Sequence, residues 1–240
     1  MQELLLKKIR LSWYFVIFFV FYAFLAVLLP RQQFEGGALT LFSVNSFLYG
    51  FYISPILSAQ KGRIEDLHKI VREEANALFA MVLATKNLPE ELRNKLQEMF
   101  RIYIRNNINY RHAAAEKDYE SLITFCLDYK GPEKKAVDSM LDKLVANQKN
   151  RTMFSMQIAN KVFSNEWMIM LMLFSITLTF ILILDTGSGL ILRFVTALLC
   201  TGLTMLLVIL VKLSTLTHKK AKQVWLPLQK LADSHFYRID

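Results

Sequence analysis

The chain has 240 residues, of which 54% are hydrophobic and 20% are charged, and its formal net charge is +9. This composition is too apolar for an ordinary soluble domain and too charged for a chain wholly embedded in lipid, so it predicts a membrane part joined to a water-exposed part. The basic residues gather at the ends of apolar segments and form no separate basic domain with stacking aromatic residues, which argues against nucleic acid as a partner.

Sequence motifs for catalysis or metal binding are absent. The sequence contains no Gly-rich phosphate loop and no GxSxG nucleophile elbow, and its cysteines and histidines lack spacings typical of zinc sites, such as CxxC. Cys126 falls in a predicted water-exposed part and Cys200 in an apolar segment, so we expect no disulfide between them. These patterns predict a protein that is not an enzyme and needs no cofactor or metal ion.

The first apolar run covers residues 11–29 and ends at Pro30. A helix needs about 20 apolar residues to cross the hydrocarbon core of a bilayer, and this run has that length. It is too long for the apolar region of a signal peptide and is followed by no small-residue cleavage site, so we interpret it as a retained membrane anchor. A short hairpin at residues 30–37 leads to the second run, residues 38–59.

The second run carries small and polar residues at helical spacing, namely Ser43, Ser46, Gly50 and Ser54. On a helix, steps of three and four residues form one stripe. Such a stripe is typical of a surface that lines an ion pathway, to which it gives hydroxyl groups and width. It is also typical of close packing between membrane helices. The sequence leaves both interpretations open.

Amphipathic helices are predicted between the second and third apolar runs. No strong breaker follows Pro55, so the second span is expected to continue as one long helix to about residue 86. A further helix starts at Pro89, a short one covers residues 119–129, and the last starts at Glu133 and should enter the third span without interruption. The expected buried seam of this last helix is Val137, Leu141, Leu144, Gln148, Arg151, Ser155, Ile158 and Val162.

Two charged residues are expected to meet between these helices. Arg151 interrupts the seam of the last helix, and Glu74 lies beside the apolar face of the first. Each lies about 16 residues from the expected membrane edge, or roughly 24 Å at the helical rise. We therefore expect an ion pair between them that fixes the register of the two helices. Two separate solvated charges are the alternative.

The third apolar run covers residues 167–184 and the fourth covers residues 190–211. Residues 185–189 between them are rich in Gly and Ser, which predicts a tight turn. Arg193 lies near the outer end of the fourth run. There it can anchor the helix at the membrane interface, or it can attract anions to the outer mouth of a pore.

Lysine and arginine are concentrated before the first and third runs and after the second and fourth, whereas the two short hairpins contain only Arg31. Positively charged residues favour the cytoplasmic side, so both hairpins are expected outside and both termini inside, in the plasma (inner) membrane. The predicted fold is all-α, a four-span helical membrane protein with a cytoplasmic helical bundle inserted between spans two and three. Its parts are a hairpin at residues 1–59, the cytoplasmic domain at 60–165, a second hairpin at 166–211 and a basic cytoplasmic tail at 212–240.

Several short stretches resemble a known family. They are Val71-Arg72-Glu73-Glu74-Ala75-Asn76-Ala77-Leu78, then Leu88-Pro89, then Arg101 with Tyr103, and later residues 147–167, where Arg151 precedes a helix into the third span. Together with the order of two spans, a helical insert and two further spans, they resemble the bestrophin-like membrane proteins of unknown function over most of residues 40–213.

The resemblance implies a homo-oligomer, pentameric as in the bestrophins, whose second spans line a pore for inorganic ions such as anions. Bestrophins also carry an acidic calcium-binding cluster after the fourth span, and residues 219–235 contain no such cluster, so calcium gating is not implied. The expected partners are thus the lipid bilayer, further copies of the chain and inorganic ions. The alternative function is a noncatalytic scaffold or signalling protein that recruits a partner through its cytoplasmic helices.

Overall fold

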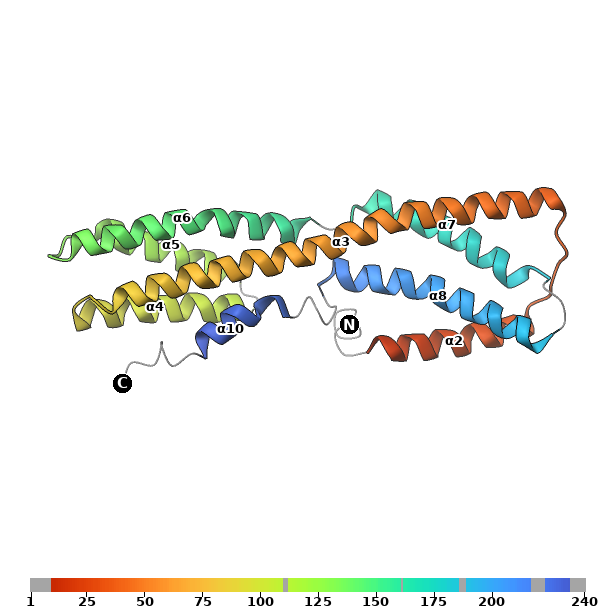
Figure 1. Cartoon of the computed structure of the whole chain (residues 1–240), viewed down its shortest axis with the longest axis horizontal. Coiled ribbons are helices and arrows are strands. Elements are labelled where there is room, and N and C mark those ends of the chain that lie inside the picture. Colours follow the sequence, from red (N-terminus) through yellow and green to blue (C-terminus); the bar gives the residue numbers. More distant parts are fainter. Residues whose placement is uncertain (1–9, 110–111, 161, 186–188, 217–222, 234–240) are drawn as a thin grey trace. The chain divides into compact units, whose positions relative to one another are not determined.

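The computed structural model describes residues 10–109, 112–160, 162–185, 189–216 and 223–233, and every regular element in these residues is a helix (Figure 1). The chain divides into two compact units. We call them the span unit, formed by Met1–Arg63 and Lys161–Ala221, and the bundle unit, formed by Ile64–Asn160 and Lys222–Asp240.

The described residues of the span unit form four helices: α2 (Leu11–Leu28), the first half of α3 (Gly36–Thr85), α7 (Ser164–Ile183) and α8 (Leu190–Ser214). All four lie in segments that are long and apolar enough to cross a membrane, which confirms the four predicted apolar helices.

Two buried clusters hold the span unit together. One joins α3 to α7 and α8 around Tyr49 and Met170, and the other joins α2 to α7 and α8 around Tyr22 and Leu182. Helix α2 packs chiefly against α8. There the hydroxyl groups of Tyr22 and Thr204 share a hydrogen bond of 2.8 Å, so the first and last spans are joined by both apolar and polar contacts.

The connection between α2 and α3 pairs with the end of α7. The backbone N–H of Gln32 donates to the carbonyl of Ile183 at 2.9 Å, and the N–H of Asp185 donates to the carbonyl of Gln32 at 2.9 Å. The two connections that follow α2 and α7 therefore share a short stretch of backbone pairing. Residues 186–188 of the predicted tight turn lie outside the described residues, as do residues 217–222 of the predicted basic tail.

Helix α3 is one helix of 50 residues, which confirms the expectation that the second predicted span continues without a break. Pro55 lies inside the helix without ending it. Membrane helices tolerate such prolines when neighbouring groups satisfy the freed carbonyl.

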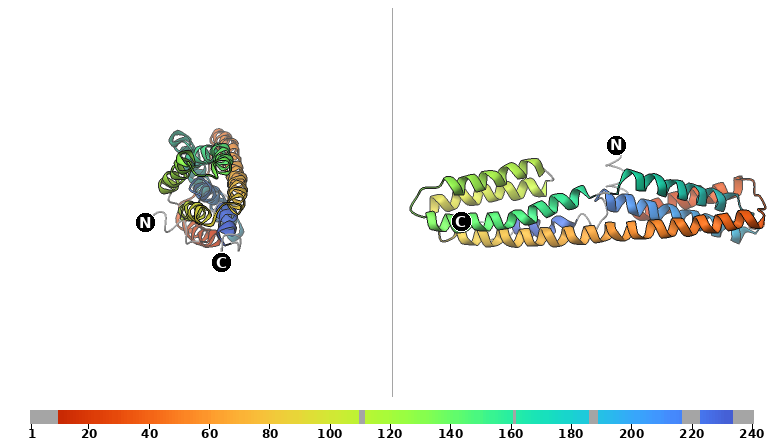
Figure 2. Two further views of the ribbon diagram at one scale, coloured as in Figure 1. Left: turned by 90° about the vertical axis from the view of Figure 1, so that its left-hand side faces the viewer. Right: turned by 90° about the horizontal axis from the view of Figure 1, so that it is seen from above.

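The bundle unit consists of α4 (Glu90–Ile108), α5 (His112–Asp128) and α6 (Lys134–Ala159), which run alongside the second half of α3 (Figure 2). Helix α4 begins after Pro89, with acidic residues in its first turn at the positive end of the helix dipole. A short 3₁₀ helix, η1 (Gln223–Trp225), leads into α10 (Leu226–Ala232), which packs on α4.

The expected continuity between the last helix of the bundle and the third span is wrong. Helix α6 ends at Ala159, and α7 starts at Ser164. The reason is a local start signal: the Glu166 carboxylate accepts a hydrogen bond of 3.0 Å from the backbone N–H of Phe163, as the third helical residue does in a capping box. Asn160, at the C-terminal end of α6, and Glu166, in the first turn of α7, are the local sequence signals for this break.

The buried seam of α6 also differs from the predicted one. The buried residues are Val137, Met140, Leu144, Asn147, Arg151 and Phe154. Val137, Leu144 and Arg151 are therefore correct, whereas Met140, Asn147 and Phe154 are buried in place of the predicted residues that follow each of them. Of the last two predicted positions, Ile158 is half-buried, and Val162 is buried but lies after the end of α6. Both sets follow steps of three and four, so the apolar pattern alone did not decide between them.

Candidate functional site

The predicted stripe on the second span is mostly exposed within the span unit. Ser43, Gly50 and Ser54 are exposed, whereas Ser46 is half-buried on the side that faces the other helices. The Oγ of Ser46 is enclosed and has no hydrogen-bond partner among the described residues. The structure thus separates Ser46 from the other three stripe residues.

Gly50 has no packing role inside the chain. A Cβ atom added at this position meets no heavy atom within 4 Å beyond its own helix and chain neighbours. Close packing between helices is the usual reason for glycine in a membrane span, because it lets two backbones approach. Within one chain this reason does not apply to Gly50, so its small size is available to another copy of the chain or to an open pathway.

The opposite face of α3 is fixed on α7. The side-chain amide of Asn45 donates to the carbonyl of Leu173 at 3.1 Å and to Oγ1 of Thr177 at 2.8 Å. The Tyr49 ring is 2% exposed and lies 6.1 Å from the Phe174 ring. These contacts orient the exposed stripe away from the other helices of the span unit.

The least apolar span is among the least covered ones. The most apolar window of α3 has a mean hydropathy of 1.2 and is 11% buried within the chain, whereas that of α8 has a mean hydropathy of 2.6 and is 44% buried. A single chain surrounded by lipid is expected to bury its least apolar helix and to expose its most apolar one, because polar groups are costly in hydrocarbon. The exposed part of α3 carries small and polar residues beside apolar side chains such as Phe47 and Phe51, which are 70% and 71% exposed.

Arg193 lies in the first turn of α8 and is half-buried. Its backbone N–H donates to the carbonyl of Gly189, and its Nε is enclosed without a hydrogen-bond partner among the described residues. The adjoining Leu190 and Ile191 are largely exposed. An arginine at a helix end beside exposed apolar residues suits an anchor at the membrane interface.

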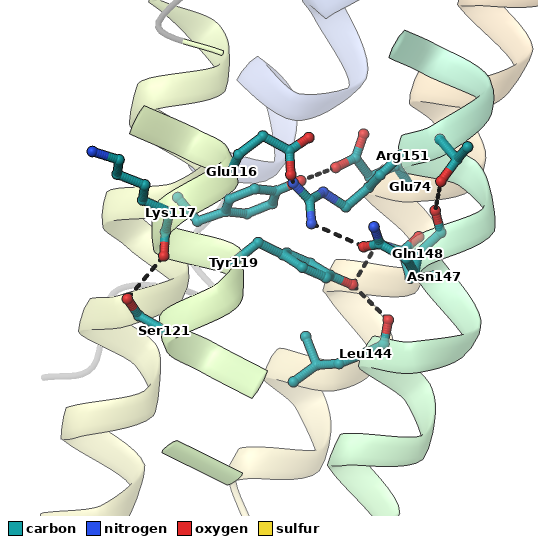
Figure 3. A network of polar contacts seen from close by, with 11 residues as sticks. Glu74, Glu116, Lys117, Tyr119, Ser121, Leu144, Asn147, Gln148 and Arg151 are labelled. Atoms are coloured by element: carbon teal, nitrogen blue, oxygen red, sulfur yellow. Dashed lines mark hydrogen bonds and ion pairs between the residues drawn. The ribbon is translucent and has the colours of Figure 1, made fainter. Parts of the chain in front are cut away.

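The bundle unit contains a second candidate site, a buried polar network centred on Arg151 (Figure 3). Glu74 on α3 is 3% exposed, and its carboxylate accepts a hydrogen bond from the hydroxyl of Tyr103 on α4. The guanidinium of Arg151 on α6 forms an ion pair with Glu116 on α5. Arg151 is 6% exposed, whereas the Glu116 side chain is 46% exposed, so this ion pair reaches from the core to the rim of the bundle.

Aromatic rings and amides complete the network. The guanidinium carbon of Arg151 lies 3.8 Å from the centre of the Tyr119 ring and 5.6 Å from that of Tyr103, which is cation–π geometry. Its Nη1 donates to Gln148 at 3.0 Å. The Tyr119 hydroxyl donates to the carbonyl of Leu144 at 2.7 Å. Four helices therefore contribute side chains to one cluster.

The predicted pair, Glu74 and Arg151, lies in this one cluster, but each side chain has a different direct partner. Glu74 is bonded to Tyr103 and Arg151 to Glu116. The rings of both Tyr103 and Tyr119 are buried, at 1% and 0% exposed. Glu116 was not predicted, and the signal that pointed to it was its position three residues before Tyr119 on the same helix.

Burial dominates the ionisation of this network. It raises the pKa of the Glu74 carboxyl above its usual value, and the hydrogen bond from Tyr103 and the charge of Arg151 oppose this only in part. Burial and the adjacent Glu74 carboxylate raise the pKa of Tyr103 well above its usual value, and burial raises that of Tyr119 to about 12. Both phenols therefore remain hydrogen-bond donors at neutral pH.

No group of three or more His, Cys, Asp or Glu side chains that could hold a metal ion is found among the described residues. In comparisons with known proteins, no family model, no curated protein and no solved structure matches the chain.

Proposed function

We propose that the chain assembles into a homo-oligomeric ion channel in which the α3 helices of several copies surround a polar pathway across the membrane. The observation that carries this proposal is the mismatch in α3, whose small and polar face is exposed although it is the least apolar of the four spans. A ring of copies removes the mismatch, because each face then meets water and the same face of other copies instead of lipid.

The proposal includes the topology and the family. The bundle unit and both termini lie in the cytoplasm, where the basic residues that flank the spans are favoured. The net charge of +9 raises the local concentration of anions and supports anion conduction. The order of the helices is that of the bestrophin-like proteins that the sequence resembles, and a pentamer is the assembly this resemblance implies.

Ion flux from liposomes tests the proposal with a matched pair of glycine variants. Gly50 on α3 and Gly202 on α8 are both exposed, and a Cβ added at either position meets nothing within 4 Å. The purified chain is reconstituted into liposomes loaded with chloride, and its oligomeric mass in detergent is measured. We expect an oligomer with chloride flux, which Gly50→Leu abolishes without changing the mass and which Gly202→Leu leaves unchanged.

Two outcomes contradict the proposal. A monomer or dimer without flux favours the alternative, a noncatalytic scaffold that recruits a partner through the bundle unit. Equal flux through wild-type, Gly50→Leu and Gly202→Leu oligomers places the pathway away from α3.

A further inference from the structure

The network around Arg151 contains two carboxylates and one cation. The ionisable groups that act on Glu74 come from every helix packed against it: Tyr103 on α4, Glu116 and Tyr119 on α5, and Arg151 on α6. With both carboxylates ionised, the cluster carries one excess negative charge, and an unpaired charge in the core of a helical bundle is costly. With Glu74 protonated, the cluster is neutral and Arg151 is matched by Glu116 alone.

The observed ion pair is the one expected of the neutral arrangement. Arg151 is paired with Glu116, whereas among the described residues the direct partner of Glu74 is the Tyr103 hydroxyl. Figure 3 draws Glu74 and Glu116, which come from different helices, in one network with Arg151, and the charge of Arg151 acts on the Glu74 carboxyl as well as on its partner Glu116. The Tyr119 ring lies 3.8 Å from the guanidinium carbon of Arg151, so a cation–π contact holds the guanidinium in addition to the ion pair.

We propose that Arg151 is a pH-dependent switch in the bundle unit, paired with Glu116 when Glu74 is protonated and drawn to Glu74 when Glu74 releases its proton to water. Loss of the proton leaves a buried carboxylate, and the cation that acts on it is the buried Arg151 guanidinium, which is paired with Glu116 in the structure. Rising pH therefore weakens the contact between α5 and α6 and strengthens the contact between α3 and α6. The inference goes beyond ion conduction and does not depend on it.

The switch predicts that the contribution of Glu116 to stability depends on pH. The test compares the thermal unfolding midpoints of the full chain in detergent, with and without Glu116→Gln, at the two ends of a pH series from about pH 5 to about pH 9 and at steps between them. At the lower pH we expect Glu116→Gln to lower the midpoint by about 2–4 °C, and at the higher pH by less than half as much. In a Glu74→Gln background, the loss should be the same at both pH values.

A second ion pair provides the matched control. Arg101 and Glu98 lie three residues apart on α4, and their side chains are 51% and 53% exposed. Glu98→Gln should change the unfolding midpoint equally at both pH values. An equal loss from Glu116→Gln at both pH values in the wild-type background overturns the proposal, as does a pH-dependent loss that persists with Glu74→Gln.

If Glu74→Gln does not fold, Tyr103→Phe supplies the test. This variant removes the donor that favours ionised Glu74, so it raises the pKa of Glu74 further. The pH at which the effect of Glu116→Gln declines should then move upward. An unchanged pH dependence in the Tyr103→Phe background rejects the switch.

Discussion

The burial of Glu74 is the residue-scale feature with the largest energetic consequence. A carboxyl that is 3% exposed loses its hydration, and one hydroxyl donor replaces only part of it. Because its pKa is raised on folding, the folded state binds the proton more tightly than the unfolded state. The stability that this difference supplies is fully present below the unfolded pKa and is lost as the pH rises through the folded pKa.

Glu74→Gln should therefore be more stable than the wild type at alkaline pH. Glutamine imitates the neutral acid, so the variant should match the wild type at about pH 4.5 and gain relative to it as the pH rises, by about 1.4 kcal/mol for each unit of the pKa shift. Denaturant unfolding of the detergent-solubilised chain across this pH range measures the gain. A variant that is less stable than the wild type at every pH contradicts the raised pKa of Glu74.

Tyr49 provides a second residue-scale prediction. Its ring is buried between α3 and α7, and its hydroxyl is enclosed without a hydrogen-bond partner among the described residues. A buried hydroxyl that lacks a partner costs about 1–3 kcal/mol. Tyr49→Phe should thus raise the free energy of unfolding by about 1 kcal/mol. A comparable loss of stability in denaturant unfolding shows instead that this hydroxyl is bonded in the protein.

Sequence reasoning placed Glu74 and Arg151 in one layer, but it could not find the ion-pair partner. Counting residues from the expected membrane edges gives the distance of a residue from the membrane along its helix. This distance was sufficient to place Glu74 and Arg151 at one level, because both of their helices were expected to continue into spans. Helix α5 joins no span, so the depth of Glu116 depends on how the connections at both of its ends fold. That information comes from tertiary packing.

At the scale of elements, the break between α6 and α7 is the clearest structural departure from the pattern. Apolar residues continue across it, yet the chain leaves the helix at Asn160 and starts a new one at Ser164. The Glu166 carboxylate satisfies the backbone N–H of Phe163, one of the polar groups that a helix start leaves unpaired. Local hydrogen bonding here outweighed an apolar periodicity that is compatible with one continuous helix.

Glu166→Ala should reduce stability by about 1 kcal/mol, the usual cost of losing a capping interaction. Glu166→Gln retains an acceptor oxygen at the same position and should cost less than half as much. Unfolding midpoints of the two variants in detergent separate the role of the cap from that of the charge. Equal losses for both variants indicate that the carboxylate acts through its charge at the helix start.

The buried seam of α6 is a second case in which apolar periodicity alone did not determine the structure. Long apolar faces and chain breakers such as Pro89 were read correctly from the sequence, and α3 is continuous as expected. The choice between Met140 and Leu141, or between Phe154 and Ser155, was not determined by periodicity. It depends on the direction from which α3 and α5 approach α6.

At the scale of the whole molecule, the proposed topology predicts which residues are accessible from each side of the membrane. Glu35, between α2 and α3, and Lys130, after α5, are both exposed. A membrane-impermeant maleimide should label Glu35→Cys in intact cells, and it should label Lys130→Cys only after permeabilisation. The opposite pattern contradicts the proposed orientation.

The native cysteines should leave this labelling experiment undisturbed. Cys126 and Cys200 are both buried. Burial also raises the pKa of the Cys126 thiol to about 11, so at neutral pH little of it is the reactive thiolate. The unsubstituted chain, treated in the same way, is the control.

The packing of α2 on α8 has a consequence for the order in which the protein is made. At ordinary rates of translation, the ribosome needs roughly 10 to 40 s to progress from the end of α2 to the end of α8. In the proposed topology, α2 resides in the bilayer during this interval, before α8, the helix that packs on it, has been made. The high hydropathy of α2 makes its exposure to lipid during this interval favourable. The hydrogen bond between Tyr22 and Thr204 can form only after α8 has been inserted.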